Sequence, residues 1–317
     1  MTAASANKVT VPGDNRLDEL KLGNKTPFWH KIPIIKELRV AVGWQKGMLI
    51  TGLVLTAFFL LVAIFAPLIA PYSYAQLKGA DGVSFPAQAA PSSEHIWGTT
   101  AGGYDVFSRV VWGARTAVIA IVVAVLLSIF AGVLLGLVSG YFGGWVDAII
   151  SRFIDILLAF PGLLLAITIV AVLGPGSVNT VIAITIFTIP GLTRMVRSVV
   201  LSLKSSEYVE ACKTMGESNL RIIFTHVIPN SMSQIIVNVT LSLGTAILTA
   251  SSLSFLGLGV TPPEAEWGAM LSQMREVIRT YPTGVLVPGI AITLVVMSFS
   301  LVGDGLRDAL DPKLKNN

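Results

Sequence analysis

Four long stretches of the chain contain no acidic or basic side chain, and they restrict its fold more than any other feature. Asp, Glu, Lys, Arg and His are absent from residues 116–146, 156–193, 227–263 and 280–303. A helix that crosses a bilayer needs about 20 consecutive apolar residues. Hydrophobic residues make up 53% of the 317 positions and charged residues 13%, which is too apolar for an ordinary soluble protein. The sequence therefore predicts an all-α, polytopic membrane protein.

Hydropathy, prolines and charge divide the chain into six predicted transmembrane helices with both chain ends in the cytoplasm. Basic residues before the first span favour a cytoplasmic N-terminus, and that span is too long and too late for a cleaved signal peptide. The predicted parts are a cytoplasmic tail at 1–48, a first span at 49–71, an external loop at 72–112, a core at 113–305 and a cytoplasmic tail at 306–317. Within the core, spans are expected at about 116–138, 155–173, 178–195, 229–251 and 285–302.

Several local patterns inside the core predict packing features. Glycines recur every four residues and form one flat helix face, which suits either packing within the chain or a contact between subunits. These glycines are Gly132, Gly136, Gly140 and Gly144. Pro161 predicts a break in the third span, and Arg152 could pair with Asp155 one helical turn away. Apolar residues at helical spacing over 267–278 predict an amphipathic helix at the outer surface.

Residues 205–229 form a long polar passage between apolar stretches, and we predict a helix there that lies outside the bilayer. Ser205 or Ser206 can cap its start, and acids follow in the first turn, where the helix dipole favours them. Gly216 can end it. Val209, Cys212 and Gly216 share one helix face, with Met215 beside them, and this small-residue face is predicted to dock against another protein.

The same passage resembles the signature of ATP-binding-cassette importer permeases. The matching residues are Glu210-Ala211-Cys212, Gly216, His226 and Ile228-Pro229, and Cys212, His226 and Ile228 depart from the general pattern. Over residues 94–313 the chain is similar to "C"-type oligopeptide and dipeptide permeases, with Tyr104 where that family usually has Arg. The resemblance implies a type I importer core with a cytoplasmic coupling helix at about 205–220. The coupling residues it implies are Glu207, Glu210, Ala211, Cys212, Gly216, Leu220 and Pro229.

The source of energy for transport follows from what the sequence lacks. The apolar stretches hold no proton or ion relay, and the chain has no Gly-x-x-x-x-Gly-Lys-Ser/Thr loop for ATP. We therefore expect no catalytic residue and no cofactor in this chain, and no nucleic-acid binding. The resemblance implies two cytoplasmic ATPase subunits that bind ATP and Mg, a homologous second permease, an external substrate-binding protein and a bacterial inner membrane. The alternative from another class is an ion-coupled secondary carrier.

The resemblance implies oligopeptides or dipeptides as substrates, with nickel, glutathione and opines as alternatives. Polar residues recur every four positions on the fifth span, and they form either a lining of the translocation path or hydrogen bonds between helices. These residues are Asn230, Gln234, Asn238 and Ser242.

The cysteine and histidine content argues against a metal site. Cys212 is the only cysteine, so an intrachain disulfide is excluded. His30, His95 and His226 are far apart in the sequence, and none has a neighbouring His or Cys. The sequence therefore predicts no metal ligands.

Overall fold

The structure, a computed structural model, describes residues 44–310 and confirms the all-α fold. Residues 1–43 and 311–317, which belong to the predicted tails at 1–48 and 306–317 and include His30, lie outside the described residues. The elements are α3 (Trp44–Ile69), α4 (Val106–Phe142), α5 (Gly144–Leu158), α6 (Gly162–Leu173), α7 (Ser177–Lys204), α8 (Glu207–Thr214), α9 (Asn219–Ile222), the π-helix η2 (Ile223–Val227), α10 (Ile228–Phe255), α11 (Trp267–Met274), the 3₁₀ helix η3 (Arg275–Val277) and α12 (Thr283–Leu310).

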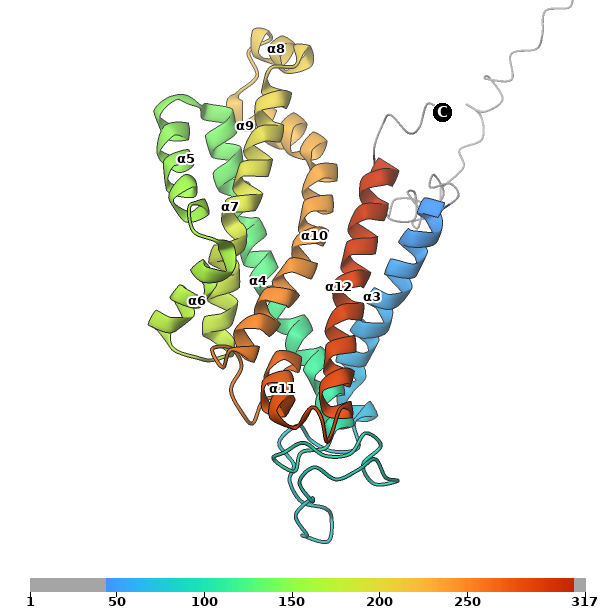
Figure 1. The fold of residues 1–317 in the computed structure, drawn as a ribbon. Coiled ribbons are helices and arrows are strands. Elements are labelled where there is room, and N and C mark those ends of the chain that lie inside the picture. Colours follow the sequence, from blue (N-terminus) through green and yellow to red (C-terminus); the bar gives the residue numbers. More distant parts are fainter. Residues whose placement is uncertain (1–43, 311–317) are drawn as a thin grey trace, which may run out of the picture.

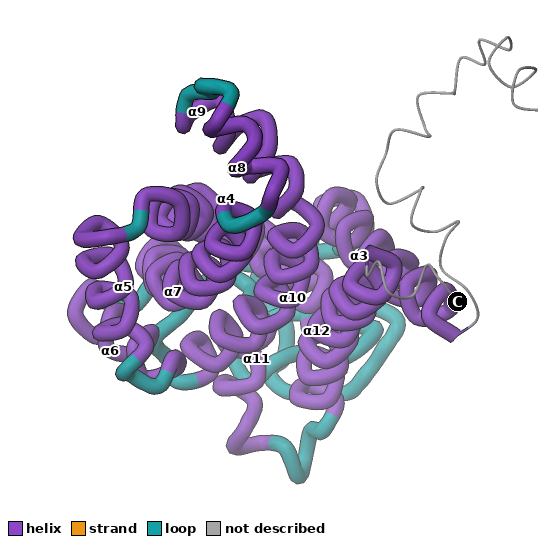
Figure 2. The backbone as a smooth tube through the Cα atoms, turned by 90° about the horizontal axis from the view of Figure 1, so that it is seen from above, coloured by secondary structure: helices purple, strands orange, loops and turns teal. Residues whose placement is uncertain are grey.

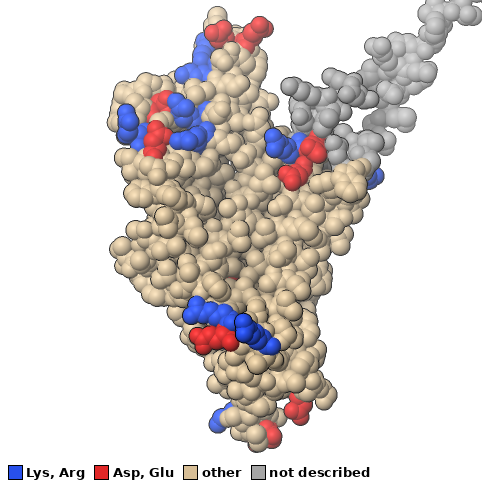
Figure 3. Space-filling view, viewed as in Figure 1, with Lys and Arg blue, Asp and Glu red and all other residues tan. Residues whose placement is uncertain are grey.

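Long apolar helices form one bundle, which fits a polytopic membrane protein. Within the described chain, five helices are long and apolar enough to cross a membrane, and a pair bent by 88° makes a sixth if it counts as one span. That pair is α5 and α6, so the predicted break at Pro161 is confirmed. Helix α8 lies at one end of the bundle, together with the described ends of α3 and α12, and α11 lies at the other (Figure 1). Charged side chains gather towards the two ends and leave an uncharged belt between them (Figure 3).

Several helices extend beyond the predicted spans, because hydropathy marks only the apolar part of a helix. Helix α3 covers 44–69 rather than 49–71, and α12 continues past residue 305, the predicted end of the core. The predicted third span at 155–173 starts too late, since α5 already begins at Gly144.

The predicted external loop at 72–112 is too long, because α4 begins at Val106. The Asp105 carboxylate caps this helix by accepting a hydrogen bond from the Ser108 amide at 2.7 Å, and His95 Nδ1 lies 2.9 Å from the same carboxylate. Arg109 falls within the predicted loop, but its guanidinium is buried and donates to three backbone carbonyls. A charged residue therefore sits inside the first turns of this helix.

Helices α4 and α7 pack closely along the glycine face, which decides between the two predicted roles. A Cβ atom added to Gly136 would lie 2.7 Å from Val196 Cβ, and Gly132 and Gly140 approach α7 in the same way. These three glycines serve packing within the chain. Gly144 differs, because it begins α5 and has open space around it.

Two ion pairs connect α5 to α7, and neither uses Arg152. Arg194 Nη2 lies 2.7 Å from Asp155 Oδ1, and Arg197 binds both oxygens of Asp147 at 2.6 Å. The predicted pairing of Arg152 with Asp155 is wrong, because the arginines of the adjacent helix reach these carboxylates. The two-point contact to Asp147 is the stronger kind of charged hydrogen bond.

The predicted amphipathic helix is present as α11 and η3. Trp267 is buried and donates its indole N–H to the Val110 carbonyl at 2.9 Å. The Glu266 carboxylate caps α11 through the Ala269 amide at 2.8 Å, and burial raises the pKa of this carboxyl. These contacts fix α11 against the N-terminal end of α4.

Candidate functional site

Helix α8 stands beyond the end of the bundle, where another protein can reach it (Figures 1 and 2). Glu207 and Glu210 lie in its first turn and Lys213 in its last, which suits the helix dipole at both ends. The prediction that a serine side chain caps this helix is wrong. Ser206 occupies the capping position, but its hydroxyl donates to the Leu203 carbonyl instead of accepting from the helix.

Gly216 ends this helix by a reversal of the chain, as predicted. Its φ angle is +82°, a left-handed conformation that glycine adopts without strain. The Glu217 amide then donates back to the Cys212 carbonyl at 3.1 Å. Ser218 accepts from the Arg221 amide and starts α9, which continues through η2 into α10. Residues 205–229 are therefore a helix, a turn and the start of the next span, and not one peripheral helix.

Val209 and Cys212 were predicted to lie on the docking face of α8, but they lie on the face that packs against the rest of the chain. Both side chains are buried, and they pack with Val200, Ile222 and Val227 in one apolar cluster. Met215 and Gly216 are exposed as expected. We define the outer face as the exposed residues Glu207, Tyr208, Glu210, Ala211, Met215, Gly216 and Leu220. Cys212 is thus corrected from a docking residue to a residue that supports α8 from below.

Pro229 lies at the start of α10, two residues after the end of an unusual helical segment. Proline has no amide hydrogen and its ring crowds the carbonyl four residues earlier, so it disturbs the usual hydrogen-bond ladder. The preceding residues form the π-helix η2, in which the Ile228 amide donates to the Ile223 carbonyl. The Asn230 side-chain amide donates to the His226 carbonyl at 2.7 Å. Pro229 is exposed and stands apart from the outer face of α8 in the sequence.

The turn and the π-helix bring three side chains together that are separate in the sequence. Cys212 Sγ lies 3.6 Å from His226 Nε2, and that nitrogen lies 3.3 Å from Glu217 Oε2. Sequence separation argued against metal ligands, but folding places His226 beside the only cysteine. Burial and the adjacent Glu217 carboxylate raise the pKa of the Cys212 thiol.

Three of the four polar residues on α10, namely Asn230, Asn238 and Ser242, donate a side-chain hydrogen bond to the carbonyl four residues earlier. The Asn238 amide donates to the Gln234 carbonyl at 3.3 Å, and the Ser242 hydroxyl donates to the Asn238 carbonyl at 2.8 Å. Asn230 and Gln234 are exposed, and Asn238 and Ser242 are partly buried. Within residues 44–310, none of the four forms the predicted hydrogen bond to another helix. Their remaining polar atoms are open to whatever lies beside α10.

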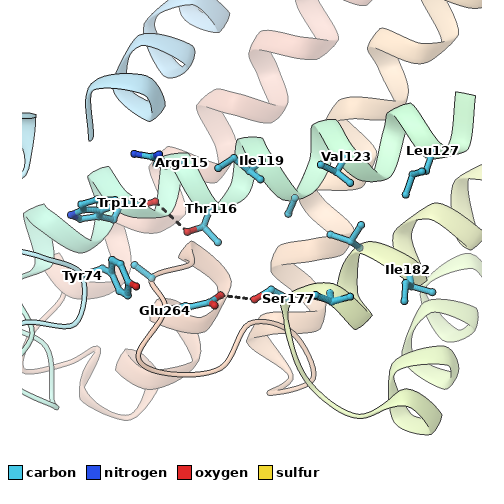
Figure 4. Close-up of a pocket in the computed structure, with 14 residues that line it drawn as sticks. Tyr74, Trp112, Arg115, Thr116, Ile119, Val123, Leu127, Ser177, Ile182 and Glu264 are labelled. Carbon is cyan, nitrogen blue, oxygen red and sulfur yellow. Dashed lines mark hydrogen bonds between the residues drawn. The ribbon is translucent and has the colours of Figure 1, made fainter. Parts of the chain in front are cut away.

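A second surface feature, which the sequence did not indicate, lies between the N-terminal halves of α4 and α7. It is a groove of about 600 Å³. Its walls are mostly apolar, and the Ser177 hydroxyl donates to the Glu264 carboxylate at its mouth (Figure 4). The lining residues include Trp112, Ile119, Val123, Leu127, Val178 and Ile182. They come from two helices far apart in the sequence, so no local pattern marks them.

A long-helix bundle with a short projecting helix occurs in solved transporter structures. The chain matches an inward-facing structure of the MetNI methionine ABC transporter with a TM-score of 0.55 and 17% identity, over 69% of this chain and 100% of that one. A likeness at this level of identity shows the fold alone. That fold is the permease fold of a type I importer.

Sequence comparison places the chain within a family. The model of the binding-protein-dependent transport system inner membrane component matches residues 132–316, and the N-terminal transmembrane domain of oligopeptide transport permease C matches residues 45–90. The chain therefore belongs to the binding-protein-dependent inner membrane components and is a permease subunit of an ATP-binding-cassette importer.

Two curated relatives cover nearly the whole chain. The dipeptide transport system permease protein DppC of Alkalihalophilus pseudofirmus is 49% identical over 272 residues, which is 86% of this chain and 88% of the relative. The glutathione transport system permease protein GsiD of Salmonella typhimurium is 44% identical over 296 residues, with coverage of 90% and 96%.

Proposed function

We propose that this chain forms half of the translocation pathway of an ATP-driven importer of short peptides, and that α8 is its coupling helix. The substrates named for the two relatives, dipeptide and glutathione, are both short peptides. This favours peptides over nickel or opines. Glutathione remains the second candidate, because its relative covers as much of the chain.

The distribution of basic residues supports a cytoplasmic location for the α8 end. Loops that face the cytoplasm carry an excess of Lys and Arg. Arg194, Arg197, Lys204, Lys213 and Arg221 are grouped close to α8 in the sequence, and the basic N-terminal tail precedes α3, which starts at the same end of the bundle. In this orientation α11 and the loop before α4 face an external substrate-binding protein.

The exposed outer face of α8 is the observation that carries the proposal. It combines acidic, apolar and small side chains on a helix that projects from the bundle, so a cleft in a partner can take it without a change in the rest of the chain. We propose that this partner is one of two cytoplasmic ATPase subunits, which bind ATP and Mg. A homologous permease completes the pathway.

A continuous set of contacts could carry a displacement of α8 into the membrane. The inner face of α8 packs on α7 and on η2, and η2 continues without interruption into α10. Helix α10 carries the polar residues predicted to line the path. When the ATPases close, a shift of α8 would therefore move α10 and open the pathway to the other side.

Substitutions that change the charge of the outer face of α8 test the coupling role. We expect Glu210→Lys and Gly216→Asp each to leave membrane insertion intact but to weaken association with the ATPase subunits about tenfold or more. A wrong charge in an interface, or a strained residue at φ +82°, opposes docking. Affinity of the purified subunits and ATP-dependent uptake are the measurements.

The matched control is Glu276→Lys, which reverses an exposed acid at the opposite end of the bundle. It should leave ATPase association unchanged. Wild-type uptake and association in both α8 variants would remove the coupling assignment.

A further inference from the structure

We propose that Cys212, Glu217 and His226 form a binding site for a divalent metal ion, best suited to Zn²⁺, beneath the coupling helix. These side chains come from the inner face of α8, from the turn after Gly216 and from the π-helix η2. The site does not depend on the substrate or on the ATPase partner of the chain.

The two separations that involve His226 match those of a tetrahedral zinc site. Ligand atoms of all three lie within 4.8 Å of one another. With zinc bonds of ~2.3 Å to sulfur and ~2.0–2.2 Å to nitrogen or oxygen, tetrahedral angles place S and N ~3.6 Å apart and N and O ~3.4 Å apart. The observed separations are 3.6 Å for Cys212 Sγ to His226 Nε2 and 3.3 Å for His226 Nε2 to Glu217 Oε2. An ion therefore fits with only small side-chain adjustments.

The contacts around Glu217 leave one of its carboxylate oxygens available to bind an ion. Glu217 Oε2 is buried and accepts no hydrogen bond within the described chain, whereas Glu217 Oε1 lies 3.2 Å from Arg221 Nε. Arg221 thus holds one oxygen of the carboxylate and directs the other towards His226. Outer contacts of this kind orient metal ligands. The local π-helix is itself a feature often found at functional sites.

The chemistry of the three groups selects the type of ion. Thiolate and imidazole ligands suit zinc, whereas calcium and magnesium prefer oxygen ligands only. Cysteine binds zinc as the thiolate, so binding of the ion would release the proton of the Cys212 thiol. The His226 and Glu217 side chains are 29% and 22% exposed, which gives an ion access from the adjoining solvent.

A bound ion would join the end of α8 directly to the start of the α10 span. The three ligands lie on either side of the Gly216 turn, where backbone hydrogen bonds and the apolar cluster also hold the chain. The ion would thus restrain the movement of α8 relative to α10. Three protein ligands leave a fourth position for water.

Alkylation of the single cysteine measures this site directly. With the full-length chain in lipid nanodiscs, we expect Zn²⁺ to slow maleimide labelling of Cys212 at least tenfold, because a zinc-bound thiolate is shielded from the reagent. Glu217→Gln and His226→Gln should each remove a ligand and lower zinc affinity by more than the ~10–100-fold typical of outer-contact changes. The matched control, Glu207→Gln, should retain full protection.

A spectroscopic measurement tests the site without relying on the reactivity of the Cys212 thiol towards maleimide. Co²⁺ added to the same nanodiscs should give thiolate charge-transfer absorption that Cys212→Ser abolishes and that Zn²⁺ displaces. Unchanged labelling with Zn²⁺, protection that survives in Glu217→Gln and His226→Gln, or Co²⁺ without a thiolate band would each overturn the proposal.

Discussion

Arg109 connects three separate segments at the α11 end of the molecule. Its guanidinium donates to the carbonyls of Tyr74, Pro263 and Glu264 at 2.9 to 3.1 Å and lies 4.5 Å from the Tyr104 ring. Buried charges are tolerated when they are hydrogen-bonded. Here both terminal nitrogens of Arg109 donate to carbonyls and the Tyr104 ring lies beside them, whereas the buried Nε has no partner within the described residues. Tyr104, a departure from the family pattern, therefore has a structural role here, because an arginine at this position would place like charges together.

Asn238 tests whether the polar residues of α10 line the translocation path. Its amide bonds only to its own helix, so Asn238→Leu should leave folding and ATPase stimulation close to wild type. If the residue contacts substrate, uptake should fall at least tenfold, which corresponds to about 1.4 kcal/mol. Uptake and ATPase activity are measured separately in the reconstituted complex.

The control for this substitution is Ser233→Leu. Ser233 is exposed and lies about 140° around the helix from Asn238, so it should not face the same space. Normal uptake in Asn238→Leu, or equal loss in both variants, would argue against the lining role.

Among the helices, α4 and α7 show how glycine sets the distance between elements. Gly132, Gly136 and Gly140 stand opposite Leu192, Val196 and Val200, and in each case the added Cβ would lie within 3.0 Å of its neighbour. The spacing of these glycines was evident from the sequence, but their partner helix was not. A repeat every four residues identifies a flat face and does not identify what packs on it.

Gly136→Ala is expected to lower the stability of the bundle by about 1–3 kcal/mol, the usual cost of overpacking. The added methyl would meet Val196 Cβ at 2.7 Å and the Thr193 carbonyl oxygen at 2.8 Å. Thermal unfolding of the detergent-solubilised chain is the measurement. Gly191→Ala on α7 is the matched control, since its added Cβ meets nothing within 4 Å.

The control should be neutral or slightly stabilising, because alanine favours a helix over glycine by up to about 1 kcal/mol. An equal or higher Tm in Gly136→Ala would contradict the close contact between α4 and α7.

At the scale of the whole molecule, the sequence was sufficient for the bundle and for the presence of a short helix at α8. Apolar length predicted the spans, Pro161 predicted the break, and Gly216 predicted the end of α8. The inner face of α8 was assigned wrongly, because periodicity shows which residues share a face but not which face is covered. The grouping of Cys212, Glu217 and His226 depends on a reversed turn followed by a π-helix, and no local pattern predicts that combination.

Local patterns also failed to predict the start of α4 and the ion pair of Asp155. Arg109 falls within the predicted loop at 72–112. Its backbone acceptors lie 35, 154 and 155 positions away, so no local pattern could show that this charged residue is buried in a helix. Asp155 was paired with Arg152 because only neighbours along one helix can be compared in a sequence, whereas Arg194 comes from another helix. Contacts between residues far apart in the sequence therefore decide where a helix such as α4 begins and which charged side chains form ion pairs.

The central claim is that energy enters through α8 from partner ATPases, and reconstitution in liposomes tests it most directly. The chain is combined with its second permease, the two ATPases and the substrate-binding protein, and uptake of a labelled dipeptide is measured with and without ATP and vanadate. We predict uptake only in the complete complex with ATP, and its loss with vanadate. Uptake by this chain alone, driven by an ion gradient without ATP, would contradict the account and indicate a secondary carrier.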